Sequence, residues 1–378
     1  MNNSFLDLSH IYLESNGALK KDALSTFLAS LPATIISSFE SNDLRTLLLN
    51  WYGPRAQLKL IKSSYLTGNS GDPIIELSIK KEIYFFKMFN TPSNGLKEYL
   101  SYLYTTERNL PHWKHVPIIK MGKLRHLNGE ERIYSISKKA SGVRGIEHIF
   151  AFNNKNDHLT SLESFFATLG TALSHLHQES TSILSEQDLY HQVLPFFNNP
   201  LLQKTFSKDP ISSQFYNEFQ TSVKTFTKTS MLGYLKSGCM APGNFSLFPG
   251  TGYIEFFDQG ELLDYLKPDG YCYTFYGYDL TNIMSYLITA SLLAPSFSKN
   301  SIVHLKKIFL NAYSPEKLPP FNQFYDLTDI WLRYHLFKIL ETLPYLENTG
   351  TYYITKFKTE LLHYIQDPKA YLAKWFYD

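Results

Sequence analysis

The sequence has little cysteine, little charge and no long hydrophobic run. Cys239 and Cys272 are the only cysteines in 378 residues, too few for a disulfide framework, which favours a reducing compartment such as the cytoplasm. The 36 basic and 34 acidic side chains leave a net charge of +2, which gives no long-range field for nucleic acid or an anionic membrane. No apolar run reaches about 18 residues, and the amino terminus lacks a secretory-signal pattern. We therefore expect a cytoplasmic protein that binds neither nucleic acid nor membrane.

Hydrophobic residues make up 44% of the chain, enough for a large core divided between two or so lobes. The first part, residues 1–57, has short helical patterns that stop at Asn16-Gly17, at Pro32 and at Gly53-Pro54. The expected helices cover 8–31 in two pieces, TIISSF at 34–39, and 43–51. We predict a helical amino-terminal extension here.

From Leu58 the hydrophobic pattern alternates, which is typical of strands. Three successive strands are predicted, followed by a helix with an apolar stripe and by two strands joined by a hairpin turn at Asn128-Gly129. In order, the strands and helix are expected at 57–66, 73–79, 81–89, 96–110 (the helix), 116–124 and 132–140. Residues 58–142 are thus predicted to form a small antiparallel sheet with one main helix.

The rest of the chain, 143–378, has mostly helical patterns. The clearest is SLESFFATLGTALSHLH at 161–177, whose leucine and phenylalanine spacing of three and four predicts a long buried helix. Further helices are expected at 212–229, 279–293, 301–312, 324–342 and 352–365. The predicted fold class is α+β, with a mixed small lobe and a larger, mostly helical lobe.

Residues 236–264, KSGCMAPGNFSLFPGTGYIEFFDQGELLD, match a known catalytic segment in part. The segment resembles that of aminoglycoside phosphotransferases and choline-kinase-like enzymes, which carry a His-Gly-Asp-x-His-x-x-Asn loop followed by a strand ending Ile-Asp-Phe. The matches are Gly238, Pro242, Gly243, Asn244, Ile254 and Phe256, and the departures are Ser237, Cys239, Ala241 and Glu255. The resemblance implies a protein-kinase-like two-lobe fold with a degenerate catalytic loop.

The resemblance also implies a nucleotide site in residues 58–142. Gly68 and Gly71 would let backbone amides approach phosphate oxygens. Lys87 would contact the α and β phosphates, and Glu98 would pair with Lys87. Backbone groups near Ser137 and Lys138 would bind adenine. Taken one at a time, these residues also fit a plain hairpin, a surface lysine, a solvated helical charge and an ordinary strand end.

The family's base and metal residues map onto the degenerate segment. Cys239 falls on the position of the catalytic aspartate, and a thiol with a pKa of about 8.5 is mostly neutral at pH 7. Asn244, Glu255 and Asp258 would bind magnesium, although Asp258 also fits a solvated acidic loop. A Cys239 nucleophile would need a nearby histidine, and His175 and His177 lie on the preceding long helix, where the family's histidine is structural. A zinc site has still less support, because no zinc motif is present.

Asp279, in a Tyr-Asp-Leu sequence, fits a helix amino-terminal cap, and in the family it braces the catalytic loop. Because two acids of the site are replaced, we expect a pseudokinase or a catalytically impaired nucleotide-binding protein that uses ATP and magnesium. The alternative is an active ATP-dependent phosphotransferase acting on the hydroxyl of a small molecule. The acceptor or protein partner stays open.

Overall fold

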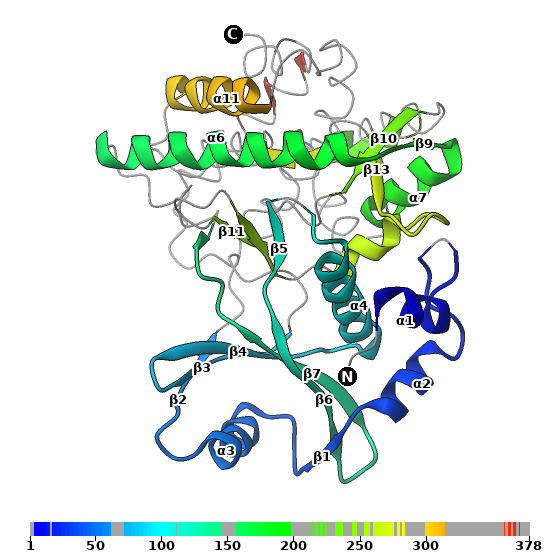
Figure 1. The fold of residues 1–378 in the computed structure, drawn as a ribbon, viewed down its shortest axis with the longest axis vertical. Helices are drawn as coiled ribbons and strands as arrows, with labels where there is room; N and C mark the ends of the chain where they lie inside the picture. The colour runs from blue at the N-terminus through cyan, green and yellow to red at the C-terminus, as the bar shows by residue number, and fades with distance from the viewer. Residues whose placement is uncertain are drawn as a thin grey trace. The chain divides into compact units, whose positions relative to one another are not determined.

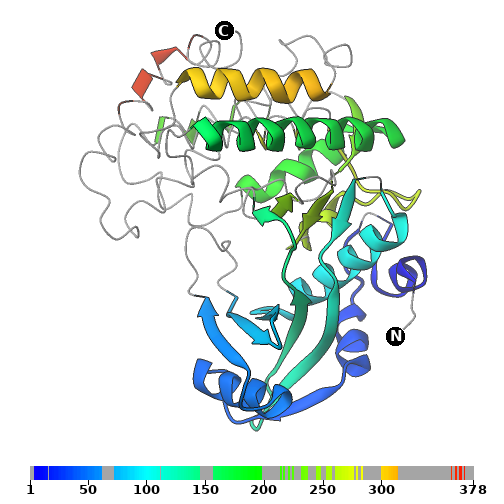
Figure 2. The same cartoon turned by 60° about the vertical axis from the view of Figure 1, so that its left-hand side comes forward.

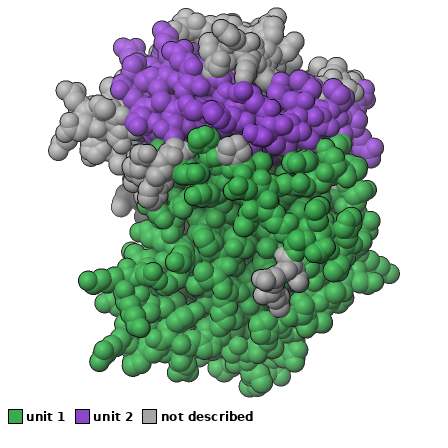
Figure 3. All heavy atoms as spheres, in the orientation of Figure 1, with its two compact units in different colours: residues 1–144, 243–272 green, residues 145–242, 273–378 purple. Residues whose placement is uncertain are grey.

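The computed structural model describes residues 4–15, 17–61, 72–110, 112–144, 156–197, 213–214, 216–217, 220–221, 224, 231–236, 244–247, 253–257, 260–275, 278–279, 282–283, 299–313, 359, 362–363, 366–367 and 370. The chain forms two compact units, residues 1–144 with 243–272 (unit 1) and residues 145–242 with 273–378 (unit 2) (Figure 3). This division differs from the predicted 1–57, 58–142 and 143–378. The first residues and 243–272 both join unit 1. Three helices and a strand of 1–57, and two strands of 243–272, pack within that unit.

Unit 1 contains a six-stranded sheet in the order β1-β6-β7-β4-β3-β2 (Figure 1). The strands are β1 (Ala33–Ile36), β2 (Gln57–Ile61), β3 (Ile74–Ile79), β4 (Glu82–Met88), β6 (Ile118–His126) and β7 (Glu131–Lys138). The meander of β2, β3 and β4 is antiparallel, which confirms the strands predicted from alternation. The helix after β4, α4 (Pro92–Arg108), is also present.

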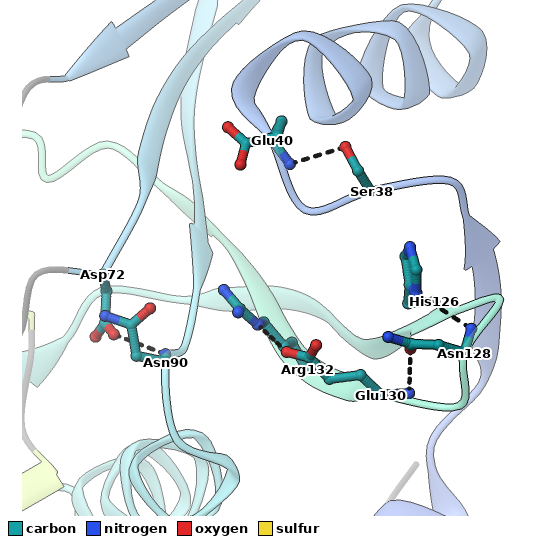
Figure 4. A network of polar contacts seen from close by, with 8 residues as sticks. All are labelled: Ser38, Glu40, Asp72, Asn90, His126, Asn128, Glu130 and Arg132. Atoms are coloured by element: carbon teal, nitrogen blue, oxygen red, sulfur yellow. Dashed lines mark hydrogen bonds and ion pairs between the residues drawn. The ribbon is translucent and has the colours of Figure 1, made fainter.

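The turn between β6 and β7 lies at the predicted Asn128-Gly129. Gly129 has φ of +92°, a conformation that glycine adopts without steric cost. Its amide donates to the His126 carbonyl at 2.9 Å, and the Asn128 side chain accepts a hydrogen bond from the Glu130 amide at 2.9 Å (Figure 4). The hairpin prediction is confirmed.

The predicted helix at 34–39 is wrong, because residues 33–36 form β1. This strand pairs in parallel with β6, from Ala33 opposite Lys123 to Ile36 opposite His126. Thr34, Ile35 and Ile36 are β-branched and suit a pleated strand. Since β1 is parallel to its neighbour, the sheet is mixed, where a purely antiparallel one was predicted.

Helix α3 (Ser41–Tyr52) covers one face of this sheet (Figures 1 and 2). Leu44 and Leu48 point from the helix into a core with the inward side chains of five strands. The fully buried members of this core are Ile36, Leu44, Leu48, Ile75, Phe86, Met88, Leu124, Tyr134 and Ile136. The strand residues that alternate with these core residues therefore point to the other face of the sheet, away from α3.

Tyr134 lies in this core, stacked on Phe86 with ring centroids 5.4 Å apart. Burial raises the pKa of Tyr134 to about 12, whereas an unfolded tyrosine has a pKa of about 10. Between these values the folded protein keeps a proton that the unfolded chain has lost, so this contribution to stability is lost as pH rises from about 10 to 12.

We therefore expect Tyr134→Phe to flatten the alkaline fall in the free energy of unfolding. Denaturant unfolding of both proteins at pH of about 9 and about 11.5 measures this. Between the lower and the higher pH, the free energy of unfolding should fall less for the variant than for the wild type. An equal fall in the free energy of unfolding of both proteins would contradict a raised pKa for Tyr134.

Unit 1 also contains a smaller sheet in the order β5-β12-β11-β8. Its strands are β5 (Trp113–His115), β8 (Val143–Arg144), β11 (Phe245–Leu247) and β12 (Ile254–Phe256). β12 runs antiparallel to β11 and parallel to β5, and Trp113 stacks on Phe256 with centroids 4.8 Å apart. The 3-10 helix η1 (Gly260–Tyr265) follows. The strand predicted to end in Ile-Glu-Phe is thus β12.

Unit 2 is built on two helices that lie side by side, α6 (Asn156–Glu179) and α11 (Lys299–Tyr313) (Figure 2). They confirm the predictions at 161–177 and 301–312. The described residues within 212–229, 279–293 and 352–365 are helical, and the prediction at 324–342 lies outside the described residues. The unit also contains α7 (Glu186–Phe197) and a sheet of β9 (Thr181–Leu184), β10 (Met231–Leu235) and β13 (Tyr273–Phe275).

Across the residues that the structure describes, no helix combines the length and the apolar character needed to cross a membrane.

Candidate functional site

Lys87 and Glu98 form an ion pair in unit 1. The Lys87 ammonium lies 2.8 Å from Glu98 Oε2, and the two side chains are 13% and 10% exposed. Lys87 alternates along β4 with Phe86 and Met88, which point into the core, so it lies on the opposite face of the sheet. The phenyl ring of Phe89 lies 4.8 Å from the ammonium. The structure therefore brings together the lysine and the glutamate that the resemblance pairs.

Helix α4 positions Glu98. The helix begins with Pro92 in its first turn, where proline is well tolerated, and it buries Leu96, Leu100 and Tyr104. Gly95 lets the helix approach the sheet closely, because a Cβ at that position would lie 2.9 Å from the side chain of Ile133 on β7. Glu98 lies one turn further on, and the close approach brings its carboxylate within reach of Lys87.

The outer side of α4 is covered by the first two helices of the chain, α1 (Phe5–Tyr12) and α2 (Ala23–Ser30). Phe27 of α2 stacks on Tyr99 of α4 with ring centroids 5.9 Å apart. Phe5 of α1 meets Tyr104 edge to face at 5.2 Å, and its amide donates to the Glu107 carboxylate. The amino-terminal segment is thus a brace for the helix that carries Glu98.

Helix α4 is attached to residues 260–272 by side chains along its length. The Tyr104 hydroxyl accepts a hydrogen bond from the Cys272 amide at 3.1 Å, and burial raises the pKa of Tyr104 well above its ordinary value. Arg108 donates to the Gly270 carbonyl at 2.7 Å, and Lys97 forms an ion pair with Asp264 on η1. These contacts explain why residues 260–272 belong to unit 1.

Asp72 is a site residue that sequence reasoning missed. Its Oδ2 lies 3.8 Å from the Lys87 ammonium, and its side chain is 1% exposed. Its Oδ1 accepts a hydrogen bond from the Asn90 amide at 2.8 Å (Figure 4). The available signal was an acid directly after the glycine turn and before β3, but its contact with the end of β4 arises only when the two strands pair.

Ser137 and Lys138, the predicted hinge residues, lie at the end of β7. The amide of Lys138 donates to the Pro117 carbonyl at 3.1 Å, and the amide of Lys139 donates to the Ile83 carbonyl at 2.9 Å. These two amides are therefore used within the sheet. A bound base would have to use carbonyl groups here or an amide further along.

Glu255 contacts the segment that follows β7. Its Oε2 accepts a hydrogen bond from the Ser141 amide at 2.6 Å. Glu255 lies opposite Ser246 in the β11–β12 ladder, and Asn244 lies opposite Phe257, whose amide donates to the Asn244 carbonyl at 3.0 Å. Residues directly opposite one another in an antiparallel pair share a face, as do residues two apart. Ser246 and Glu255 therefore lie on one face, and Asn244 directly precedes β11.

The chemistry of these three residues suits a hard cation. A carboxylate, an amide and the hydroxyl of Ser246, which is fully buried, offer the oxygen ligands that magnesium prefers. Among the described residues, however, no group of three His, Cys, Asp or Glu side chains gathers as a metal site. One oxygen of Glu255 is already engaged with Ser141.

Four predicted site residues lie outside the described residues: Gly68, Gly71, Cys239 and Asp258. They include the degenerate loop position and the third predicted magnesium ligand. The roles assigned to these four residues stay predictions.

His177, considered as a partner for Cys239, is a buried residue of unit 2. Its Nδ1 lies 2.7 Å from the Tyr313 hydroxyl and its Nε2 lies 3.4 Å from Asp279 Oδ2. Asp279 is fully buried. The two nitrogens therefore have partners within the helical core, which fits a structural role for this histidine and ties the Tyr-Asp-Leu sequence to α6 and α11.

No family model matches the sequence, and no curated protein matches it. Among solved structures, the aminoglycoside-3'-phosphotransferase of type VIII covers 80% of this chain over 100% of its own length, with 13% identity and a TM-score of 0.50. Aminoglycoside phosphotransferase APH(4)-Ia covers 85% of this chain over 99% of its own length, with 11% identity and a TM-score of 0.49. The likeness to the type VIII enzyme shows the fold. The chain has an α+β, kinase-like fold of the aminoglycoside phosphotransferase type, as the sequence predicted.

Proposed function

We propose that this protein is a pseudokinase or catalytically impaired kinase-like protein that binds a nucleotide beside Lys87. The observation that carries the proposal is the ion pair between Lys87 and Glu98, 2.8 Å long and mostly shielded from water. In protein kinases such a pair must be in place for the lysine to contact the nucleotide phosphates. Here it is preformed, since α4 is braced on its outer side by Phe5 and Phe27.

The impairment rests on the degenerate loop. A general base accepts or orients the proton of the acceptor hydroxyl, and the thiol of Cys239 is a poor substitute for a carboxylate at neutral pH. Glu255, in turn, uses one carboxylate oxygen for the Ser141 amide. Nucleotide binding would survive these changes better than turnover would. Lys87 and Glu98 lie in a different part of the sequence from Cys239 and Glu255.

The proposed ligand is ATP with magnesium. Magnesium would neutralise phosphate charge, and Lys87 would contact the α and β phosphates while Glu98 holds it in place. The other residues assigned to this site are Gly68 and Gly71 for the phosphates, backbone groups near Ser137 and Lys138 for the base, and Asn244, Glu255 and Asp258 for magnesium. The proposed location is the cytoplasm, in keeping with the two cysteines of the sequence.

A thermal-shift panel of ATP, ADP and GTP, each with and without magnesium, tests the proposal. Ligand that binds the folded protein at about 100 times its Kd stabilises it by roughly 2.7 kcal/mol, so the wild-type melting temperature should rise. Lys87→Met should remove most of that rise, because it deletes the ammonium that meets the phosphates and leaves Glu98 facing them.

The matched control is Lys59→Met, which removes an exposed lysine from β2 of the same sheet and should leave the rise intact. Because Lys87→Met also removes the ammonium beside two buried carboxylates, each variant is compared with its own melting temperature without ligand. No shift at millimolar nucleotide in the wild type would refute the proposal, and so would an undiminished shift in Lys87→Met.

The alternative, an active phosphotransferase with an atypical site, has the same preformed pair in its favour. Phosphoryl transfer depends chiefly on positioning and charge neutralisation, so loss of the base reduces turnover without necessarily abolishing it. ATP consumption that requires magnesium and disappears in Lys87→Met would favour this alternative. Binding without consumption would favour the pseudokinase.

A further inference from the structure

Lys87 faces a second carboxylate in addition to Glu98. Asp72 Oδ2 lies 3.8 Å from the ammonium and Glu98 Oε2 lies 2.8 Å from it. The Asp72 side chain is 1% exposed, and the Asn90 amide fixes its other oxygen at 2.8 Å. A backbone amide just after β4 therefore fixes the Asp72 carboxylate beside the ammonium.

The charges of these three groups do not cancel. The lysine–glutamate pair alone is neutral, and an ionised Asp72 adds one negative charge beside it. Buried charges are little screened by salt. A phosphate that approaches Lys87 would thus meet an extra negative charge within a few ångströms of the cation that should bind it.

We infer that Asp72 makes nucleotide binding at Lys87 depend on a divalent cation. The inference rests on the proposed function, and it adds a positioning residue to that site. A nucleotide complexed with magnesium carries less negative charge than the bare nucleotide, so the Asp72 charge disfavours the bare form more strongly. Asp72 also competes with phosphate for the ammonium in the ligand-free protein.

Asp72→Asn is the direct test, since asparagine keeps an oxygen for the Asn90 amide and removes only the charge. Isothermal titration calorimetry with ATP in EDTA and with ATP in excess magnesium gives two dissociation constants for each protein. We expect the variant to bind bare ATP about tenfold more tightly than the wild type does. The gain in affinity for ATP with magnesium should be smaller. The dissociation constants in EDTA and in magnesium should therefore differ by a smaller factor in the variant than in the wild type.

The matched control is Glu130→Gln, which removes one exposed carboxylate from the β6–β7 turn, where it pairs with Arg132 (Figure 4). It should leave both constants unchanged. If Asp72→Asn does not fold, Asp72→Ser removes the same charge with a smaller side chain, and the melting temperature of each variant identifies the folded ones.

The outcomes separate this inference from the proposed function. Binding by wild type and variant with the same magnesium dependence overturns the role of Asp72 and leaves the nucleotide site standing. Binding of bare ATP by the variant, where the wild type binds ATP only with magnesium, supports both. If neither protein binds ATP under either condition, the proposed function fails and the role of Asp72 fails with it.

Discussion

Replacing Phe86 with alanine should lower the free energy of unfolding by about 3–5 kcal/mol, the usual loss when a buried phenylalanine is truncated. Phe86 is fully buried and lies between Ile75 on β3 and Ile136 on β7 in the sheet register. Its ring also stacks on Tyr134. Removal of the ring would leave a cavity in the middle of the six-stranded sheet, under helix α3.

The neighbouring Phe85 supplies the control, because it lies on the other face of β4 and is only half-buried. Phe85→Ala should cost clearly less. Denaturant unfolding followed by tryptophan fluorescence measures both, since Trp51 of α3 packs against Tyr134 with ring centroids 5.3 Å apart. Similar losses in the two variants would contradict the assignment of faces, and with it the placement of Lys87 opposite the core.

Replacing Phe27 with alanine should loosen α4 although Phe27 belongs to a different helix. Phe27 is almost fully buried and contacts Tyr99 of α4 and Tyr12 of α1. Truncation of such a side chain typically costs about 3–5 kcal/mol, which is of the order needed to undock the amino-terminal helices. Without the brace, α4 would open more often and Glu98 would hold Lys87 less firmly.

Hydrogen exchange of peptides covering α4 measures this loosening. Amide exchange in α4 should accelerate in Phe27→Ala, and nucleotide binding should weaken with it. Thr26→Ala, an exposed change on the same helix, should alter neither. If exchange accelerated in α2 but not in α4, the amino-terminal helices would merely rest on α4 without bracing it.

The parts of the fold that were predictable are those encoded by nearby residues. Alternation in PIIELSI and KEIYFFKMF locates β3 and β4, and the Asn128-Gly129 dipeptide locates the hairpin turn. The leucine and phenylalanine spacing at 161–177 locates α6. The Lys87–Glu98 pair came from the resemblance, since the spacing of these two residues alone also fits a surface lysine and a solvated glutamate.

The features that were missed depend on partners far away in the sequence. β1 is four residues long, and its strand conformation is supported by β6, some ninety residues later. Asp72 looks like a loop residue until β3 pairs with β4 and its carboxylate meets Lys87. Glu255 was read only as a metal ligand, and its contact with Ser141 spans 114 residues. Local patterns carry no record of such contacts.

The division of unit 1 into two stretches of sequence has a consequence for synthesis. Residues 145–242 leave the ribosome between the two stretches, which takes roughly 5–20 s at 5–20 residues per second. During that interval Trp113 lacks Phe256, and Tyr104 and Arg108 lack the segment that ends at Cys272. Apolar side chains of the nascent chain therefore stay uncovered for seconds, and during that time chaperones could bind them.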